Sequence, residues 1–182
     1  MTAPLPRVTE ILAATGLGFD PTGISAPVLE AARLRGELVH AGIEALVYGY
    51  EAPALTDPIA APYLDAWRKF LAESGFKAER AEFEVAHPAW RYQGHPAVLG
   101  WLLGKRIILD AKTGDQTGVA YQLAGYRAAW NAEHPTEPVE AIAAVKLNYD
   151  GRYRFHEIEV PAAERVWLAA VTVFHAQQEQ RR

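Results

Sequence analysis

The spacing of hydrophobic residues changes repeatedly along this sequence, and no other feature limits the fold more. Apolar residues three and four positions apart indicate helices at residues 7–15, 28–48, 57–74, 117–133 and 161–179. Short β-branched or aromatic segments bounded by turn residues indicate strands at residues 77–86, 91–102, 105–111, 138–147 and 152–160. This order of helices and strands predicts an α/β domain with one central sheet.

The size and composition fit one globular domain that covers residues 1–182. Hydrophobic residues make up 50% of the chain and charged residues 22%, which argues against disorder. No apolar run approaches the roughly 18 residues that span a bilayer, and residues 1–7 lack the layout of a signal peptide. We therefore expect a cytoplasmic protein that does not contact a membrane. The absence of cysteine excludes disulfides, thiolate zinc sites and cysteine nucleophiles.

The net charge of −4 limits how this chain can bind nucleic acid. It comes from 18 Lys and Arg residues against 22 Asp and Glu residues. Proteins that bind nucleic acid mainly by neutralising many phosphates are usually basic, so a sequence-wide basic surface is not expected. A local basic groove beside metal-binding carboxylates remains compatible with this charge.

The most informative segment is an apolar strand that ends in two charged residues. Residues 107–109 are Ile-Ile-Leu, and Asp110 and Lys112 follow on one face because side chains alternate along a strand. Asp110 can hold a divalent cation, and Lys112 can orient or deprotonate a water or stabilise negative charge, so the pair suits metal-assisted hydrolysis. A surface ion pair at the end of a strand explains these two residues equally well.

Polar residues on two predicted helices extend this candidate site. The long helix carries Arg35, Gly36 and His40, and the helix after the Asp-Ala-Lys segment carries Gln122 and Tyr126 on one face. Taken alone, His40 reads as a packing residue, and the Gln–Tyr pair as a half-buried polar edge.

Together these segments resemble the RecB-like branch of the PD-(D/E)XK nuclease superfamily, which includes Cas4-like and phage recombination exonucleases. The matching segments, in order, are Arg35-Gly36…His40, Gly94-His95-Pro96-Ala97, Asp110-Ala111-Lys112-Thr113-Gly114 and Gln122…Tyr126. The resemblance spans about residues 28–160 and implies a restriction-endonuclease-like central mixed sheet flanked by helices. It also implies a Mg²⁺- or Mn²⁺-dependent deoxyribonuclease that hydrolyses phosphodiesters at DNA ends in recombination or repair.

The resemblance assigns a role to each of the site residues. It implies that position 97, Asp110, the carbonyl of Ala111 and His40 hold the metal, while Lys112 positions the attacking water. Gln122 and Tyr126 contact the DNA backbone near the scissile phosphate or brace the site. One of Glu82 and Glu84 is a candidate to face the site, although a solvated strand edge is the favoured interpretation. The implied DNA-contacting residues are Arg33, Arg35, Gln122, Tyr126 and Arg127.

The sequence departs from the family at its first metal-binding aspartate, where this chain has Ala97. A methyl group cannot bind a hard cation, so the chain as given is predicted to be inactive. Retention of the other site residues favours an engineered Asp-to-Ala replacement. The alternative is a natural non-catalytic module that kept the nuclease fold and binds nucleic acid or protein. The expected partner is DNA with free ends, and a homo-oligomer or a recombination partner protein is left open.

Overall fold

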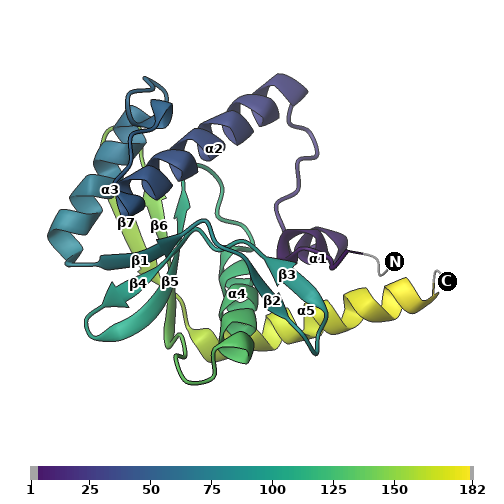
Figure 1. Ribbon diagram of the computed structural model, residues 1–182. Coiled ribbons are helices and arrows are strands. Elements are labelled where there is room, and N and C mark those ends of the chain that lie inside the picture. Colours follow the sequence, from purple (N-terminus) through teal and green to yellow (C-terminus); the bar gives the residue numbers. More distant parts are fainter. Residues whose placement is uncertain (1–3, 181–182) are drawn as a thin grey trace.

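A five-stranded mixed sheet forms the centre of the molecule, with helices on both faces (Figure 1). This computed structural model describes residues 4–180, so the first three residues of the segment inspected for a signal peptide lie outside it. The strand order is β1-β4-β5-β6-β7, and only the β5–β6 pair is parallel. The strands are β1 (Lys77–Ala81), β4 (Val98–Leu102), β5 (Lys105–Lys112), β6 (Ala141–Leu147) and β7 (Tyr153–Glu157). The predicted α/β fold with a central mixed sheet flanked by helices is confirmed.

Alternation of apolar side chains along β5 divides the core into two layers. Ile107 and Leu109 pack under the first helical layer, whereas Ile108 packs under the second. The first layer contains α2 (Ala26–Tyr48), the short 3₁₀ helix η1 (Pro53–Leu55) and α3 (Ala61–Ser74). The second contains α1 (Val8–Ala14), α4 (Val119–Glu133) and α5 (Val160–Gln180). Because both faces of β5 are buried, its carboxyl end carries Asp110 and Lys112 to a fixed position between the layers.

Two of the predicted strands are each divided into two. The segment 77–86 forms β1 and β2 (Val85–His87), and the segment 91–102 forms β3 (Tyr92–Gly94) and β4. Glu82 adopts a φ of 47°, which ends β1, and Pro96 has no N–H group to continue a ladder. β2 and β3 pair separately as a two-stranded sheet. The predicted helix at 57–74 also begins later, because the Asp57 carboxylate accepts hydrogen bonds from the N–H groups of Ile59 and Ala60 in a turn.

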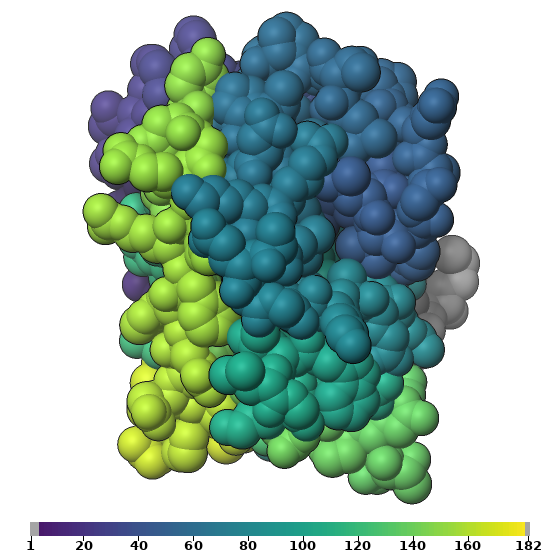
Figure 2. All heavy atoms as spheres, turned by 90° about the vertical axis from the view of Figure 1, so that its left-hand side faces the viewer, coloured from purple at the N-terminus to yellow at the C-terminus, as the bar shows by residue number. Residues whose placement is uncertain are grey.

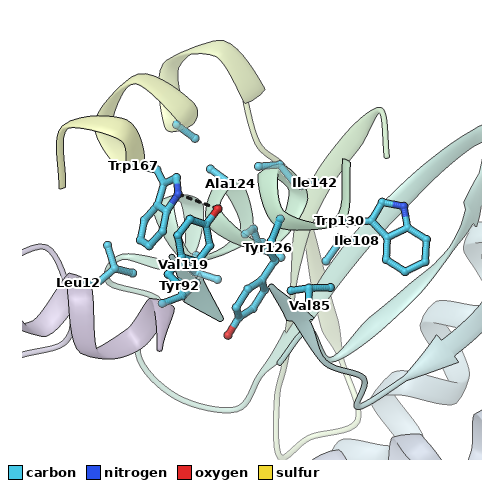
Figure 3. Close-up of a cluster of buried hydrophobic side chains, with 14 of the residues drawn as sticks. Leu12, Val85, Tyr92, Ile108, Val119, Ala124, Tyr126, Trp130, Ile142 and Trp167 are labelled. Atoms are coloured by element: carbon cyan, nitrogen blue, oxygen red, sulfur yellow. Dashed lines mark hydrogen bonds between the residues drawn. The ribbon is translucent and has the colours of Figure 1, made fainter. Parts of the chain in front are cut away.

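Aromatic residues fix α4 between α5 and the small sheet (Figure 3). Trp167 Nε1 donates to the Tyr92 hydroxyl at 3.3 Å, and that hydroxyl donates to the carbonyl of Gly125 at 2.8 Å. The ring of Tyr126 lies against Gly94, where an added Cβ would be 2.4 Å from a ring carbon. Glycine at position 94 therefore lets Tyr126 approach the polar groups at the end of β5. No helix within residues 4–180 is long and apolar enough to cross a membrane.

Candidate functional site

Asp110 and Lys112 form an ion pair at the carboxyl end of β5. Lys112 Nζ lies 2.8 Å from Asp110 Oδ2, and the Asp110 side chain is only 2% exposed. This contact lacks hydrogen-bond geometry, so Oδ2 is a buried oxygen without a hydrogen-bond partner in the described part of the chain. A buried carboxylate oxygen in this state can accept another cation or a proton donor.

Gln122 and Tyr126 extend the ion pair into α4. Gln122 Oε1 lies 3.4 Å from Lys112 Nζ, and Gln122 Nε2 donates to the Tyr126 hydroxyl at 2.8 Å. Burial, followed by the negative charge of Asp110, raises the pKa of Tyr126, which therefore stays a neutral phenol. The structure thus places Asp110, Lys112, Gln122 and Tyr126 in one connected polar chain.

His40, on α2 in the first helical layer, contacts the same group of polar residues from the other side. Its Nε2 lies 3.0 Å from the carbonyl oxygen of Ala111, and its Nδ1 lies 2.7 Å from Glu82 Oε1. Both partners are acceptors, so only the imidazolium form can donate to both. Burial acts to lower the pKa of His40, but the hydrogen bond to Glu82 and the charge of Asp110 outweigh it, and the pKa is raised.

We expect NMR titration of the metal-free chain to give His40 a pKa above its ordinary value, and Glu82→Gln to lower that pKa. Because the pKa of His40 is higher in the folded than in the unfolded state, the protonated ring stabilises the fold fully at any pH below the unfolded-state pKa. That contribution is lost as pH rises through the folded-state pKa. His87 of β2, whose pKa is lowered by burial, is the matched control and should keep the same pKa in both proteins. A His40 pKa that Glu82→Gln leaves unchanged would contradict the paired imidazolium.

Glu82 is the site residue that sequence reasoning placed elsewhere. The sequence favours a solvated strand edge for Glu82 and Glu84. Glu84 is exposed, whereas the Glu82 side chain is only 22% exposed. It contacts His40 through Oε1 and lies 3.4 Å from His95 Nε2 through Oε2. The turn that ends β1 directs Glu82 inward, and strand alternation alone does not predict this turn.

Ala97 lies immediately before β4 and is buried, with 4% of its surface exposed. The β4–β5 register ends at the Val98–Leu109 pair, and Ala97 and Asp110 are the residues next to this pair on the two segments. The Ala97 carbonyl accepts a hydrogen bond from the N–H of Glu82 at 2.9 Å. The backbone at position 97 therefore lies between the segment that carries Glu82 and the segment that carries Asp110. Among residues 4–180, no three His, Cys, Asp or Glu side chains form a ready metal-binding group.

The three predicted DNA-contacting arginines occupy different surroundings. Arg35 Nε donates to Thr113 Oγ1 at 3.2 Å, which places this guanidinium next to the end of β5. Arg33 pairs with Glu30 and Glu37 along the exposed side of α2. Arg127 pairs with Glu164 of α5. Of the three, the structure brings only Arg35 next to the Asp-Ala-Lys segment.

An open groove of about 670 Å³ gives access to this region from the side of α2. His40, Glu82 and His95 line its floor, and Arg33, Glu37 and Glu44 line the α2 side. A larger pocket of about 850 Å³ lies between the N-terminal segment and α5, and it contains none of the residues that surround Asp110. The groove, unlike the larger pocket, therefore reaches His40 and Glu82, the two residues that adjoin the end of β5 from the α2 side.

Comparison with solved structures supports the fold. A crystal structure described as a "putative exonuclease" from Eubacterium rectale aligns with a TM-score of 0.58 and 8% sequence identity, over 92% of this chain and 71% of that chain. The structure of SSO0001 aligns over 76% of this chain and 74% of that chain at 16% identity, and its TM-score of 0.36 is too low to carry an argument. No family model and no curated protein matches the sequence. The likeness shows that this chain shares its fold with the Eubacterium rectale protein.

Proposed function

We propose that this chain is a DNA-binding domain of the RecB-like PD-(D/E)XK type that acts at DNA ends. In this proposal it is a metal-dependent exonuclease when position 97 carries aspartate, and it is catalytically silent with Ala97. One observation carries the proposal: the buried Asp110 and the half-buried Lys112 form an ion pair at the end of a single strand, where Lys112 also contacts Gln122 and His40 contacts the Ala111 carbonyl. Two oxygens that can bind a cation, from Asp110 and the Ala111 carbonyl, beside the Lys112 ammonium group suit phosphodiester hydrolysis.

The residues that would hold Mg²⁺ or Mn²⁺ are Asp110, the Ala111 carbonyl and His40. His40 would first have to lose the proton that its Nε2 donates to the Ala111 carbonyl, because only the neutral ring can bind a cation. Asp110 Oδ2 fits this role, because it is buried and accepts no hydrogen bond from the described residues. Position 97 does not fit, since its methyl group offers no oxygen ligand. When bound, such a cation lowers the pKa of a coordinated water and neutralises phosphate charge.

The remaining roles follow from the position of each side chain. Lys112 Nζ lies beside Asp110 and Gln122, where it can orient a water and stabilise charge that develops on a phosphate oxygen. Tyr126 is held as a neutral hydrogen-bonding group, which suits bracing of Gln122 or a contact to a phosphate. The Arg35 guanidinium, which donates to Thr113, adds a second positive charge near Lys112 at the end of β5. Arg33, Gln122 and Tyr126 complete the proposed DNA contacts, whereas Arg127 would first have to leave Glu164.

A non-catalytic binding module is the second candidate, and one observation favours it. In the Ala97 form the site's charges are paired internally, Lys112 with Asp110 and His40 with Glu82. A site in this state is electrostatically satisfied without a cation, as expected of a domain that retains the fold for binding alone.

We expect the Ala97 form to bind linear DNA better than covalently closed circular DNA of the same sequence and length. The phosphate contacts from Arg35, Lys112 and Gln122 do not require the missing carboxylate. Affinity should be modest, given the net charge of −4, and should fall steeply with added salt. The measurement is a competition titration of the two DNA forms against a labelled linear fragment at two salt concentrations.

Equal affinity for linear and closed DNA would contradict the assignment to DNA ends. Binding to neither form would contradict DNA binding altogether and leave a protein-interaction module. A supercoil-relaxed circle serves as the control, because it removes torsional strain as an explanation.

A further inference from the structure

The edge strand β7 separates its basic and aromatic side chains onto opposite faces. Tyr153 and Phe155 face α3, where their rings lie 5.4 and 5.9 Å from that of Phe70. Arg154 and His156 alternate with them and are exposed, and Arg152 continues the alternation in the preceding turn. Figure 2 shows the segment that contains β7 (yellow-green) along the surface beside the blue segment that contains α3. The exposed face of β7 therefore carries three basic side chains in succession.

This basic face is in register with the candidate site. In the strand register Arg154 lies opposite Lys146 on β6, and Lys146 lies opposite Lys112 on β5. Directly paired residues point to the same face of a sheet, and neighbouring strands lie roughly 4.8 Å apart. A row of cations thus runs from Lys112 across β6 to the edge of the sheet. We call Lys112, Lys146, Arg152, Arg154 and His156 the basic row.

Neighbouring acidic and polar groups engage part of this charge. Arg152 Nε donates to Asp150 Oδ2 at 2.7 Å, and Lys146 Nζ donates to the carbonyl of Gly114 close to Asp115. Lys112 is paired with Asp110. The Arg154 guanidinium has no ion pair or hydrogen bond within residues 4–180, so it is the member most available to an external anion.

An exposed tyrosine lies in the turn between β6 and β7, three residues before Arg152. Tyr149 in the β6–β7 turn is 69% exposed, and its ring meets that of Tyr63 edge-on at 6.0 Å. A shallow pocket of about 440 Å³ lies between Tyr149, Arg152 and Arg154. Cations that follow a backbone, combined with an aromatic face for a base, are the features that bind single-stranded nucleic acid.

We propose that the basic row carries the phosphate backbone of a DNA single strand between the candidate site and the edge of the sheet, with a base stacked on Tyr149. The proposal rests on the proposed function, because it places one strand of that substrate. It differs from edge protection, in which charged residues on an edge strand only prevent strand-to-strand aggregation.

The test compares the affinity of the full chain and its variants for a fluorescent oligo-dT by anisotropy, without added metal. Arg152→Ala/Arg154→Ala should weaken binding about 10-fold and reduce the slope of log K against log[salt] by about 0.7 for each phosphate that the variant no longer neutralises. Tyr149→Ala should weaken binding about 5-fold or more, because the base has no ring to stack on. Arg165→Ala on α5 and Lys105→Ala at the opposite end of β5 are matched controls and should bind like the parent, since both residues are exposed and lie away from the row.

The possible outcomes test the role of the basic row separately from the proposed function. If the parent binds oligo-dT and both the double variant and Tyr149→Ala bind it equally well, the row is not the path, while the proposed function stands. If the double variant loses solubility but keeps its affinity, edge protection is the correct account. A loss confined to duplex DNA would overturn the single-strand assignment. A parent that binds no DNA would overturn both proposals, and unchanged circular dichroism and melting temperature in each variant exclude misfolding as a cause of weaker binding.

Discussion

Replacing Ala97 with aspartate should give a chain that cleaves linear DNA with Mg²⁺ or Mn²⁺ at least about 100-fold faster than the parent. Losing even a group that only supports a metal ligand typically costs 10–100-fold, so restoring a direct ligand should exceed that range. The new carboxylate would stand on the residue next to the Val98–Leu109 pair, as Asp110 does on β5. It would supply the oxygen that the present site lacks.

Cleavage of end-labelled DNA by the purified variant, followed with and without a chelator, measures this effect. Ala97→Asn is the matched control, because it has nearly the same shape as aspartate but lacks the charge, and it should remain close to the parent. An Ala97→Asp protein that stays inert on single- and double-stranded DNA, both linear and circular, would refute the nuclease assignment.

In the Ala97→Asp background, Asp110→Ala and Lys112→Ala should each abolish detectable cleavage without unfolding the domain. Asp110 is a proposed cation ligand and Lys112 the proposed water-positioning group, so loss of either removes a contribution that the other cannot replace. Asp110→Ala relieves the repulsion between crowded carboxylates, so its melting temperature should stay nearly constant or rise. Lys112→Ala leaves the buried Asp110 carboxylate without its cation, so it should lower the melting temperature while the domain stays folded.

Cleavage rates and melting temperatures measured on the same preparations show whether Asp110 and Lys112 act in cleavage or only stabilise the fold. Lys105→Ala is the matched control for Lys112→Ala, since it removes a lysine from the other end of the same strand. If both Asp110→Ala and Lys112→Ala unfold the protein, the pair is a structural ion pair instead. If they fold but cleave normally, other residues carry the chemistry.

Periodicity predicted the central sheet because β5 is apolar on both faces and lies inside the molecule. Ile107, Ile108 and Leu109 fill two different core layers, and such a run has few alternatives to a central strand. The same alternation placed Asp110 and Lys112 on one face, and the structure finds them in contact. Helical spacing likewise placed Gln122 and Tyr126 together, and their side chains are hydrogen-bonded.

The surroundings of Glu82 could not be read from local pattern. Its inward direction depends on a φ of 47° at the end of β1 and on the position of His40, which lies 42 residues earlier. Neither is encoded in the alternation of residues 77–86, which reads as one continuous strand. Local pattern therefore predicts a solvated edge for Glu82, whereas in the structure its carboxylate contacts both His40 and His95.

The basic row also depends on information that single segments do not contain. Lys112, Lys146 and Arg154 belong to three strands, and only the pairing register aligns them. A shift of one residue in either pairing would turn one of these side chains to the other face. Conversely, Arg127 looked available from the sequence, and its pairing with Glu164 arises only when α5 packs on α4.

We propose that the start of β4 and the end of β5 form a divalent-cation site that lacks one carboxylate. Titration of Mn²⁺ into DNA-free protein, followed by electron paramagnetic resonance, tests it without depending on catalysis. We expect Ala97→Asp to bind Mn²⁺ at least about 10-fold more tightly than the parent, and added Asp110→Asn to return the affinity to the parent's level or below. Equal Mn²⁺ affinity in the parent, the Ala97→Asp variant and the double variant would contradict it.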